Sequence, residues 1–315
     1  MTRTIVEHIG RTPLVPLRRL GAGLRVPVLV KCEHVNPGGS VKDRIAAAIV
    51  ADAEARGLLT PGMTLIEATA GNTGVGLALV AAARGYSLVC VMPEKMSHDK
   101  RAALTALGAR VIITANAAPS HPDNFRNLAR RLAAERGWFL TDQFNNPVNV
   151  RVHAETTALE ILEQTGGQVA AFVAGAGTGG TISGVGRRLK QALARVQVVL
   201  ADPIGSGLAD WVETGTLGAD GAYAVEGIGG SEAPANLHRE VIDRAERVSD
   251  EESFATALRL IREEGLLVGG SAGTNVAAAL RVAARADVDG PVVTVLPDGW
   301  DRYRSKPWLL GAGGG

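Results

Sequence analysis

Four glycine-dense loops contain the residues of this sequence that are best suited to chemistry. Each loop combines glycines with small hydroxyl or amide side chains, and the first also contains a lysine. The loops read Asn36-Pro37-Gly38-Gly39-Ser40-Val41-Lys42-Asp43-Arg44, Thr69-Ala70-Gly71-Asn72-Thr73-Gly74, Gly175-Ala176-Gly177-Thr178-Gly179-Gly180-Thr181 and Gly269-Gly270-Ser271-Ala272-Gly273-Thr274. Glycine clusters can simply mark tight turns, but that explanation is adequate for one loop and weak for four.

The first loop predicts an activated lysine. Pro37-Gly38-Gly39 forms a turn, Ser40 is a suitable N-cap, and Lys42 falls in the first turn of the following helix. The helix dipole disfavours a cation there, so we expect the position to lower the pKa of Lys42. A neutral lysine attacks an aldehyde, as a Schiff base with pyridoxal 5′-phosphate requires. Most lysines are solvated, so Lys42 taken alone would be assigned to the surface.

The third loop predicts a phosphate site and permits two interpretations. Gly175, Gly177 and Gly180 match the dinucleotide pattern G-x-G-x-x-G, and Asp202 follows the next strand about twenty residues on, where a ribose-binding acid is expected. Alternatively, residues 177–181 surround a single phosphate with N–H groups and threonine hydroxyls. A nicotinamide-dependent oxidoreductase has no use for the Lys42 or Ser271 loops, whereas a pyridoxal-phosphate enzyme uses all four.

Apolar strand-like runs alternate with alanine-rich amphipathic stretches, which predicts an α/β fold with mostly parallel sheets flanked by helices. In such folds ligands bind beyond the carboxyl ends of strands, where these loops fall. The length of 315 residues and the 46% hydrophobic content favour two closely packed lobes. We expect strands near Val28 to Lys31, Thr64 to Glu67, Leu88 to Met92, Val111 to Thr114, Val169 to Ala174, Val196 to Ala201 and Val292 to Leu296.

Composition and charge exclude several classes of function. The net charge of +1 argues against nucleic acid and anionic membranes, and no apolar stretch is long enough to span a bilayer. Cys32 and Cys90 lie in apolar runs that resemble buried strands, so a cytoplasmic protein without disulfides is expected. The 6 histidines lack metal-ligand spacing, so we expect surface or capping roles for them and no metal. For Asp298, before Gly299, a turn or cap role competes with a place near the cofactor.

Taken in order, these motifs resemble the fold-type-II pyridoxal-phosphate family that contains cysteine synthase (O-acetylserine sulfhydrylase) and cystathionine β-synthase. The resemblance covers nearly the whole chain, through IGRTPL, NPGGSVKDR, EATAGNTG, DQFNNP, HAETTALEI, GAGTGGT, VEGIGG, EEGLLVGGSAG and VVTVLPD. It implies a two-lobed, tryptophan synthase β-like architecture. Residues 39–145 would form a smaller mobile lobe, and residues 1–38 plus 146–315 a larger lobe that holds the cofactor phosphate, with the active site in the cleft between them.

The resemblance also implies residue roles. Lys42 would form the internal aldimine and move the substrate α-proton, Asn72 would bond the ring hydroxyl, and Ser271 would face the pyridine nitrogen. The phosphate would be bound by Gly177, Thr178, Gly179, Gly180 and Thr181. The substrate would be bound by Thr69, Gly71, Asn72, Thr73, Gln143 and Gly227. For Gln143, a surface amide bonded to the nearby backbone is the competing interpretation.

The implied reaction is β-replacement on serine or an O-activated serine through an aminoacrylate, with a sulfide or thiol nucleophile. We expect a cysteine synthase-like reaction of O-acetylserine with sulfide. Cystathionine β-synthase, which joins serine and homocysteine, is the alternative, and an NAD-dependent oxidoreductase is less favoured. A homodimer is expected, and the cleft could also dock the tail of serine acetyltransferase. Ala70, and Gly230 to Glu232, depart from the family pattern and leave the second substrate open.

Overall fold

A computed structural model describes residues 4–311 apart from 95, 97 and 119. The chain divides into two compact units. The first combines the chain up to Ile9 with Asn36–Asn149, and the second combines Gly10–Val35 with the chain from Val150 onward. The expected smaller lobe, residues 39–145, lies within the first unit; its mobility and the cleft stay predictions.

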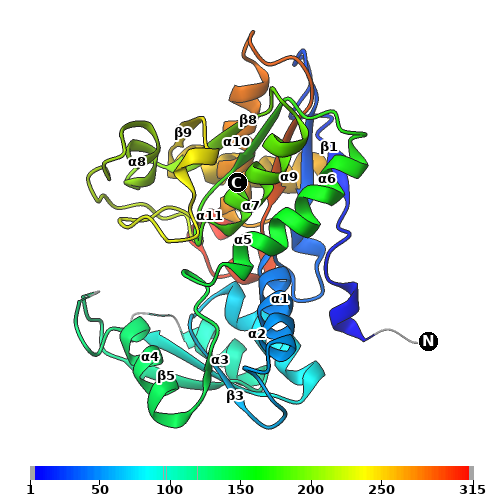
Figure 1. Ribbon diagram of the computed structural model, residues 1–315. Coiled ribbons are helices and arrows are strands. Elements are labelled where there is room, and N and C mark those ends of the chain that lie inside the picture. The colour runs from blue at the N-terminus through cyan, green and yellow to red at the C-terminus, as the bar shows by residue number, and fades with distance from the viewer. Residues whose placement is uncertain (1–3, 95, 97, 119, 312–315) are drawn as a thin grey trace. The chain divides into compact units, whose positions relative to one another are not determined.

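The first unit is built on a four-stranded sheet in the order β5-β4-β3-β6, in which all neighbouring strands are parallel. Helices α1 and α2 pack together over one face, and α4 covers the other (Figure 1). These elements are β3 (Thr64–Ala68), β4 (Ser87–Pro93), β5 (Arg110–Thr114), β6 (Phe139–Leu140), α1 (Lys42–Ala55), α2 (Asn72–Arg84), α3 (His98–Ala106) and α4 (Phe125–Arg136).

Alternation along these strands explains the three layers. Leu65 and Cys90 belong to the apolar cluster on the α1 and α2 side, whereas Ile66 and Val91 belong to the cluster that contains Ala129 of α4. Successive side chains of a strand point to opposite faces, so a strand with two covered faces is apolar throughout. The layers bring the N-termini of α1 and α2, which carry Lys42 and Asn72, into the same unit.

The second unit contains a six-stranded sheet in the order β1-β2-β10-β7-β8-β9, in which only β1 is antiparallel to its neighbour. Helices α9 and α10 pack on one face, and α6, α7 and α8 on the other. The strands are β1 (Leu14–Pro16), β2 (Val28–Cys32), β7 (Ala171–Ala174), β8 (Gln197–Pro203), β9 (Arg244–Val248) and β10 (Val292–Leu296).

The helices of the second unit follow its strands. The long ones are α7 (Gly180–Ala192), α9 (Asp250–Glu264) and α10 (Gly270–Ala283), and the shorter ones α6 (Ala158–Gln164), α8 (Leu208–Thr214) and α11 (Pro307–Leu310). Helix α5 (Val148–Val152) continues into a π-helical turn, His153–Thr157, before α6. Short 3-10 turns are Ile5–His8, Glu33–Val35, Arg239–Val241 and Trp300–Tyr303.

The expected strands are all present, with ends shifted by a few residues, and the predicted α/β fold with mostly parallel sheets is confirmed. Three strands were missed, each for a physical reason. β1 ends on a proline, β6 has 2 residues, and β9 reads RAERV, a charged edge strand with little apolar signal. No described helix has the length and apolarity that a membrane crossing needs.

Cys32 and Cys90 lie in β2 and β4, and both side chains are buried. Burial raises the pKa of Cys32 to about 11 and that of Cys90 to about 12. Both are therefore protonated thiols near neutral pH, so neither is suited to act as a nucleophile.

Candidate active site

Lys42 is the first residue of α1, as its loop predicted. The N-cap of α1 is Val41 and not Ser40 as expected, but the Lys42 N–H donates to Ser40 Oγ at 3.2 Å, so Ser40 still satisfies one of the unpaired amides at the helix start. Asp43 Oδ2 accepts from the Gly38 N–H at 2.5 Å, and a Cβ on Gly38 would lie 2.5 Å from the same carboxylate. The turn before Lys42 therefore requires a glycine, and the half-buried lysine is held at the positive end of a helix.

The start of α2 collects the residues predicted to bind the substrate carboxylate. Asn72 is the first residue of this helix, with Gly71 as its N-cap, and Thr69 Oγ1 accepts from the Gly71 N–H at 3.2 Å. A Cβ on Gly71 would meet nothing within 4 Å, so its backbone borders open space. Backbone amides at a helix start that borders open space form a suitable anion site.

Gln143 comes from the distant loop after β6 and joins this site. Thr73 Oγ1 donates to Gln143 Oε1 at 2.5 Å, and Thr73 and Gln143 are 4% and 5% exposed. A buried amide bonded to the helix that carries Asn72 is not the surface amide of the competing interpretation. Sequence motifs alone could not have placed these two side chains in contact.

Glu67, at the end of β3, is a site residue that sequence reasoning missed. It is 1% exposed, and its carboxylate accepts hydrogen bonds from Thr141 and from the Gln143 backbone N–H. Burial raises the pKa of Glu67 above its usual value, and these hydrogen bonds oppose the rise. A charged residue inside an apolar strand was the available signal.

In the second unit, the loop from β7 to α7 has the form predicted for a phosphate site. Gly179 has φ +85°, and a Cβ there would lie 2.5 Å from the Leu237 nitrogen; a Cβ on Gly177 would lie 2.2 Å from the Gly227 carbonyl oxygen. The Gly229 N–H donates to the Ala176 carbonyl at 2.9 Å and fixes the loop further. Glycine is therefore required at both positions, and the first N–H groups of α7, with Thr178 and Thr181 beside them, suit a phosphate.

His153 corrects the expectation of surface or capping roles for the histidines. It is 1% exposed in the π-helical turn, and its two ring nitrogens lie 3.2 Å from Thr181 Oγ1 and 2.9 Å from Thr157 Oγ1. The ring is thus held by Thr157 and orients one hydroxyl of the phosphate loop. π-turns frequently occur at functional sites, and nothing in the local sequence predicted this one.

Ser271 lies in the first turn of α10 and is 3% exposed. Asp298 lies beside the start of this helix: its carbonyl accepts from the Gly269 N–H at 3.1 Å, and a Cβ on Gly269 would lie 2.4 Å from its carboxylate. Tyr303 Oη donates to Asp298 Oδ2 at 2.7 Å, and burial raises the pKa of Tyr303 well above its usual value. Asp298 therefore supports the helix start that presents Ser271.

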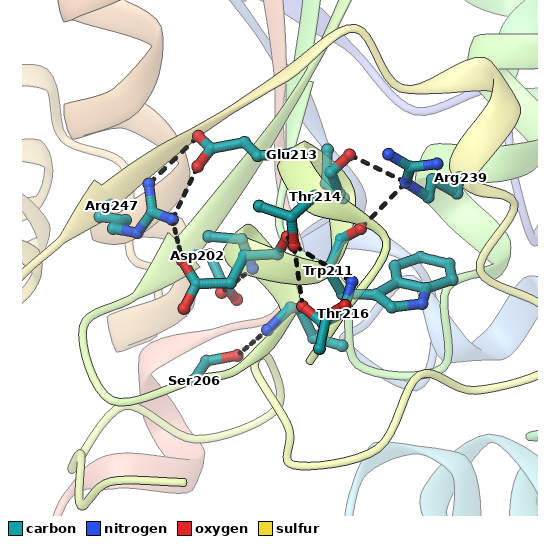
Figure 2. A network of polar contacts seen from close by, with 12 residues as sticks. Asp202, Ser206, Trp211, Glu213, Thr214, Thr216, Arg239 and Arg247 are labelled. Carbon is teal, nitrogen blue, oxygen red and sulfur yellow. Dashed lines mark hydrogen bonds and ion pairs between the residues drawn. The ribbon is translucent and has the colours of Figure 1, made fainter. Parts of the chain in front are cut away.

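Asp202 does not fit a ribose-binding acid. Its side chain is 0% exposed, and Oδ2 accepts from the Ala209 N–H at 2.8 Å, where Asp202 caps the turn into α8. Figure 2 shows Asp202 within the polar network around α8, in which Arg247 pairs with Glu213. Burial raises the pKa of Asp202 to about 6. Because the Asp202 carboxylate is buried and bonded to the backbone of its own loop, it is not placed to bind a ribose, and the dinucleotide interpretation loses its main support.

These residues fit pyridoxal phosphate. Considered separately, the first unit contains a lysine and a helix start suited to an anion, and the second contains a glycine-lined loop suited to a phosphate and a buried serine hydroxyl. Most of the predicted residues lie at or beside a helix N-terminus. The exceptions are Gln143, which contacts such a terminus through Thr73, and exposed Gly227, which has φ +87°. The described residues contain no cluster of three or more histidine, cysteine, aspartate or glutamate side chains that could hold a metal ion.

Comparisons with known proteins agree with this chemistry. The sequence pattern of the family described as "Pyridoxal-phosphate dependent enzyme" matches residues 5–298. Cystathionine β-synthase of Apis mellifera is 45% identical over 96% of this chain and 60% of its own length, so the chain spans about three fifths of that relative. Cysteine synthase 1 of Emericella nidulans is 44% identical over 98% of this chain and 86% of its own length.

A crystal structure of O-ureido-L-serine synthase superposes with a TM-score of 0.91 and 40% identity, and covers 100% of this chain and 97% of that chain. The predicted family, cofactor and fold class are confirmed, and the names of these relatives support the predicted β-replacement. The chain belongs to the family of pyridoxal-phosphate dependent enzymes.

Proposed function

We propose that the chain catalyses β-replacement on serine or an O-activated serine with a sulfur nucleophile, as a cysteine synthase that joins O-acetylserine and sulfide. The observation that carries this proposal is the pairing of Thr73 with Gln143 at the start of α2. This arrangement suits the α-carboxylate of an amino acid, and a lysine that starts α1 lies in the same unit.

The substrate carboxylate is bound at the start of α2. Gln143 Oε1 accepts from Thr73, so the donors proposed for the substrate carboxylate are the Gln143 Nε2 amide and the N–H groups of Asn72 and Thr73. Thr69 lies one turn earlier and is 6% exposed. Because this group of residues offers several hydrogen-bond donors, it favours an anionic part of the substrate.

Lys42 acts as the acid and base. When bound, the cofactor supplies an electron sink that acidifies the substrate α-carbon. Lys42 Nζ removes the α-proton, a task for which the neutral amine of a half-buried lysine at the start of α1 is suited. As the resemblance implies, Asn72 would hold the ring hydroxyl of the cofactor and the neutral Ser271 hydroxyl would face its ring nitrogen, which would favour elimination over transamination.

The cofactor phosphate is bound by the Gly177 to Thr181 loop. Backbone N–H groups and the hydroxyls of Thr178 and Thr181 donate to its oxygens. His153 keeps the Thr181 hydroxyl oriented, and Gly227 closes against Gly177. This loop would anchor the cofactor through its phosphate, independently of Lys42.

The second substrate is the less constrained part of the proposal. Relatives of similar identity are named cystathionine β-synthase and cysteine synthase, so homocysteine with serine is the alternative pair. The structural relative named O-ureido-L-serine synthase adds hydroxyurea to the nucleophiles worth testing. The Gly230 to Glu232 segment, which departs from the family pattern, follows the Gly227 loop and is expected to influence this choice.

A substrate panel tests the proposal. The purified protein is reconstituted with pyridoxal phosphate and mixed with serine, O-acetylserine or O-phosphoserine, and the cofactor absorbance is followed. Sulfide, homocysteine or hydroxyurea is then added, and products are identified by mass spectrometry. Cysteine formed from O-acetylserine and sulfide supports the first assignment. Failure of every β-substituted serine to change the cofactor spectrum would overturn β-replacement.

We further propose a cytoplasmic homodimer that takes part in amino-acid biosynthesis, as the resemblance implies. The dimer would be supported if light scattering during gel filtration gave a mass of twice the 32.7 kDa of one chain. A peptide with the tail sequence of serine acetyltransferase should compete with O-acetylserine if that partner docks at the substrate site.

A further inference from the structure

Glu67 forms an unusual buried contact with the substrate-binding loop. Its Oε2 accepts from Thr141 Oγ1 and, at 3.2 Å, from the Gln143 backbone N–H, and its Oε1 accepts from the Ala68 N–H at 3.0 Å. The side chain is 1% exposed. Both carboxylate oxygens therefore face donors, an arrangement that a carboxylate satisfies and a neutral amide does not.

The loop that carries Gln143 is held on both sides of this residue. Its N–H donates to Glu67, and its carbonyl accepts from Asn149 Nδ2 at 2.8 Å. The preceding residue, Asp142, has φ +46°, a left-handed conformation that aspartate adopts more readily than most side chains, and its carbonyl accepts from the Asn146 N–H at 2.8 Å. The turn at Asp142 and the bonds to Glu67 and Asn149 together fix the position of the Gln143 main chain.

The pairing of β6 with β3 does not itself require Glu67. The Thr141 N–H donates to the Ile66 carbonyl at 3.1 Å, and Ile66 pairs in register with Leu140, so backbone bonds already join the two strands. Burying a carboxylate is costly unless hydrogen bonds compensate it. The additional bond is the one that Glu67 accepts from the Gln143 N–H, and the Gln143 side chain in turn accepts from Thr73.

We propose that Glu67 is a positioning residue for substrate binding: its carboxylate fixes the Gln143 main chain so that the Gln143 side chain bonds Thr73 and donates to the substrate α-carboxylate. The inference rests on the proposed function, because it assigns the support of the same carboxylate site. Glu67 itself touches neither substrate nor cofactor in this account, so its effect should pass through Gln143.

Glu67→Gln is the main test. Its NH₂ group must oppose either the Gln143 N–H or the Ala68 N–H, so we expect the KM for O-acetylserine to rise about tenfold, while kcat stays within about twofold. Glu33→Gln is the matched control: Glu33 is buried like Glu67 and accepts from Thr12 Oγ1 at 2.7 Å, but lies in the second unit. The control should leave KM unchanged.

A double-mutant cycle tests whether Glu67 acts through Gln143. In a Gln143→Ala background, Glu67→Gln should change KM by less than about twofold, because the group it positions is gone. Fully additive effects of the two substitutions would overturn the inference. So would an unchanged KM for Glu67→Gln in an enzyme whose wild type turns over.

Hydrogen exchange supplies a readout that needs no turnover. The peptide covering residues 141–146 should exchange at least about tenfold faster in Glu67→Gln, while peptides of β7 and β8 keep wild-type rates. If the wild type acts on no β-substituted serine, the proposed function fails, but this exchange experiment still tests the positioning. If Glu67→Gln does not fold, Glu67→Asp replaces it as the test. This variant keeps the charge on a shorter side chain and should raise KM about threefold. An unchanged KM would contradict the inference.

Discussion

Thr73 Oγ1 donates to Gln143 Oε1 at 2.5 Å, and this bond joins two residues 70 positions apart in the chain. Thr73 lies in the first turn of α2, and Gln143 in the loop after β6. Because β3 pairs in parallel with both β4 and β6, the carboxyl ends of these strands meet at one edge of the sheet. The topology therefore assembles the proposed carboxylate site from separate motifs.

Removing the Thr73 hydroxyl should weaken substrate binding. Thr73→Val keeps the shape but leaves Gln143 Oε1 without its donor, so we expect the KM for the amino-acid substrate to rise about tenfold, which corresponds to about 1.4 kcal/mol. Thr73→Ser retains a hydroxyl and should stay within about threefold of wild type. Steady-state kinetics of both variants check this, and equal KM values for the two would contradict it.

Replacing His153 should weaken cofactor binding more than it affects folding. His153→Phe fills the buried space but no longer bonds Thr181, so the Kd for pyridoxal phosphate should rise about tenfold. Equilibrium dialysis measures this constant without turnover. Thr157→Val removes only the far partner of the ring and should have a smaller effect. A Kd unchanged by His153→Phe would exclude a role in orienting Thr181.

Residues of the site that belong to short motifs could be predicted from the sequence, whereas residues that act through distant contacts could not. Lys42, Asn72, Ser271 and the phosphate loop occur in short contiguous motifs whose glycines and helix starts are visible in the sequence. Glu67 and His153 act through contacts with residues that are 76 and 28 positions away, so their roles depend on tertiary packing. Strands with a continuous apolar run were predicted, including the edge strand β5, whereas β9 was missed because its edge position tolerates charge.

Asp202 should make stability depend on pH between about 4 and 6. Burial raises its pKa from 3.8 in the unfolded chain to about 6, so ionisation is disfavoured in the folded protein. The contribution of Asp202 to the free energy of unfolding is thus fully present below pH 3.8. It is lost as the pH rises through about 6, and the total loss is about 3 kcal/mol.

Asp202→Asn removes this dependence while keeping an acceptor for the Ala209 N–H. Relative to wild type, the variant should gain unfolding free energy between pH 4 and 7, as measured by urea denaturation at each pH. Asp287→Asn is the control, because the pKa of Asp287 is lowered to about 2 and the group does not titrate in this window. A difference between Asp202→Asn and wild type that stays constant with pH would contradict the account.

Gly177→Ala should disrupt the phosphate loop. Its Cβ would lie 2.2 Å from the Gly227 carbonyl oxygen, a backbone atom that cannot move without shifting a second loop. We expect a loss of about 1 to 3 kcal/mol in stability and weaker cofactor retention after gel filtration. Gly311→Ala is the control, because a Cβ there meets nothing within 4 Å. Wild-type stability and retention for Gly177→Ala would show that the loop is not packed as described.

The central claim is that Lys42 carries the cofactor. Lys31 is the informative comparison, because its side chain is fully buried, pairs with Glu160 at 2.7 Å and donates to the Thr12 carbonyl. The reconstituted protein is reduced with borohydride, digested and analysed by mass spectrometry. We predict a pyridoxyl phosphate group on Lys42 alone, and its absence from Lys42→Ala. A group attached to another lysine of the wild-type protein, or to none, would contradict the account.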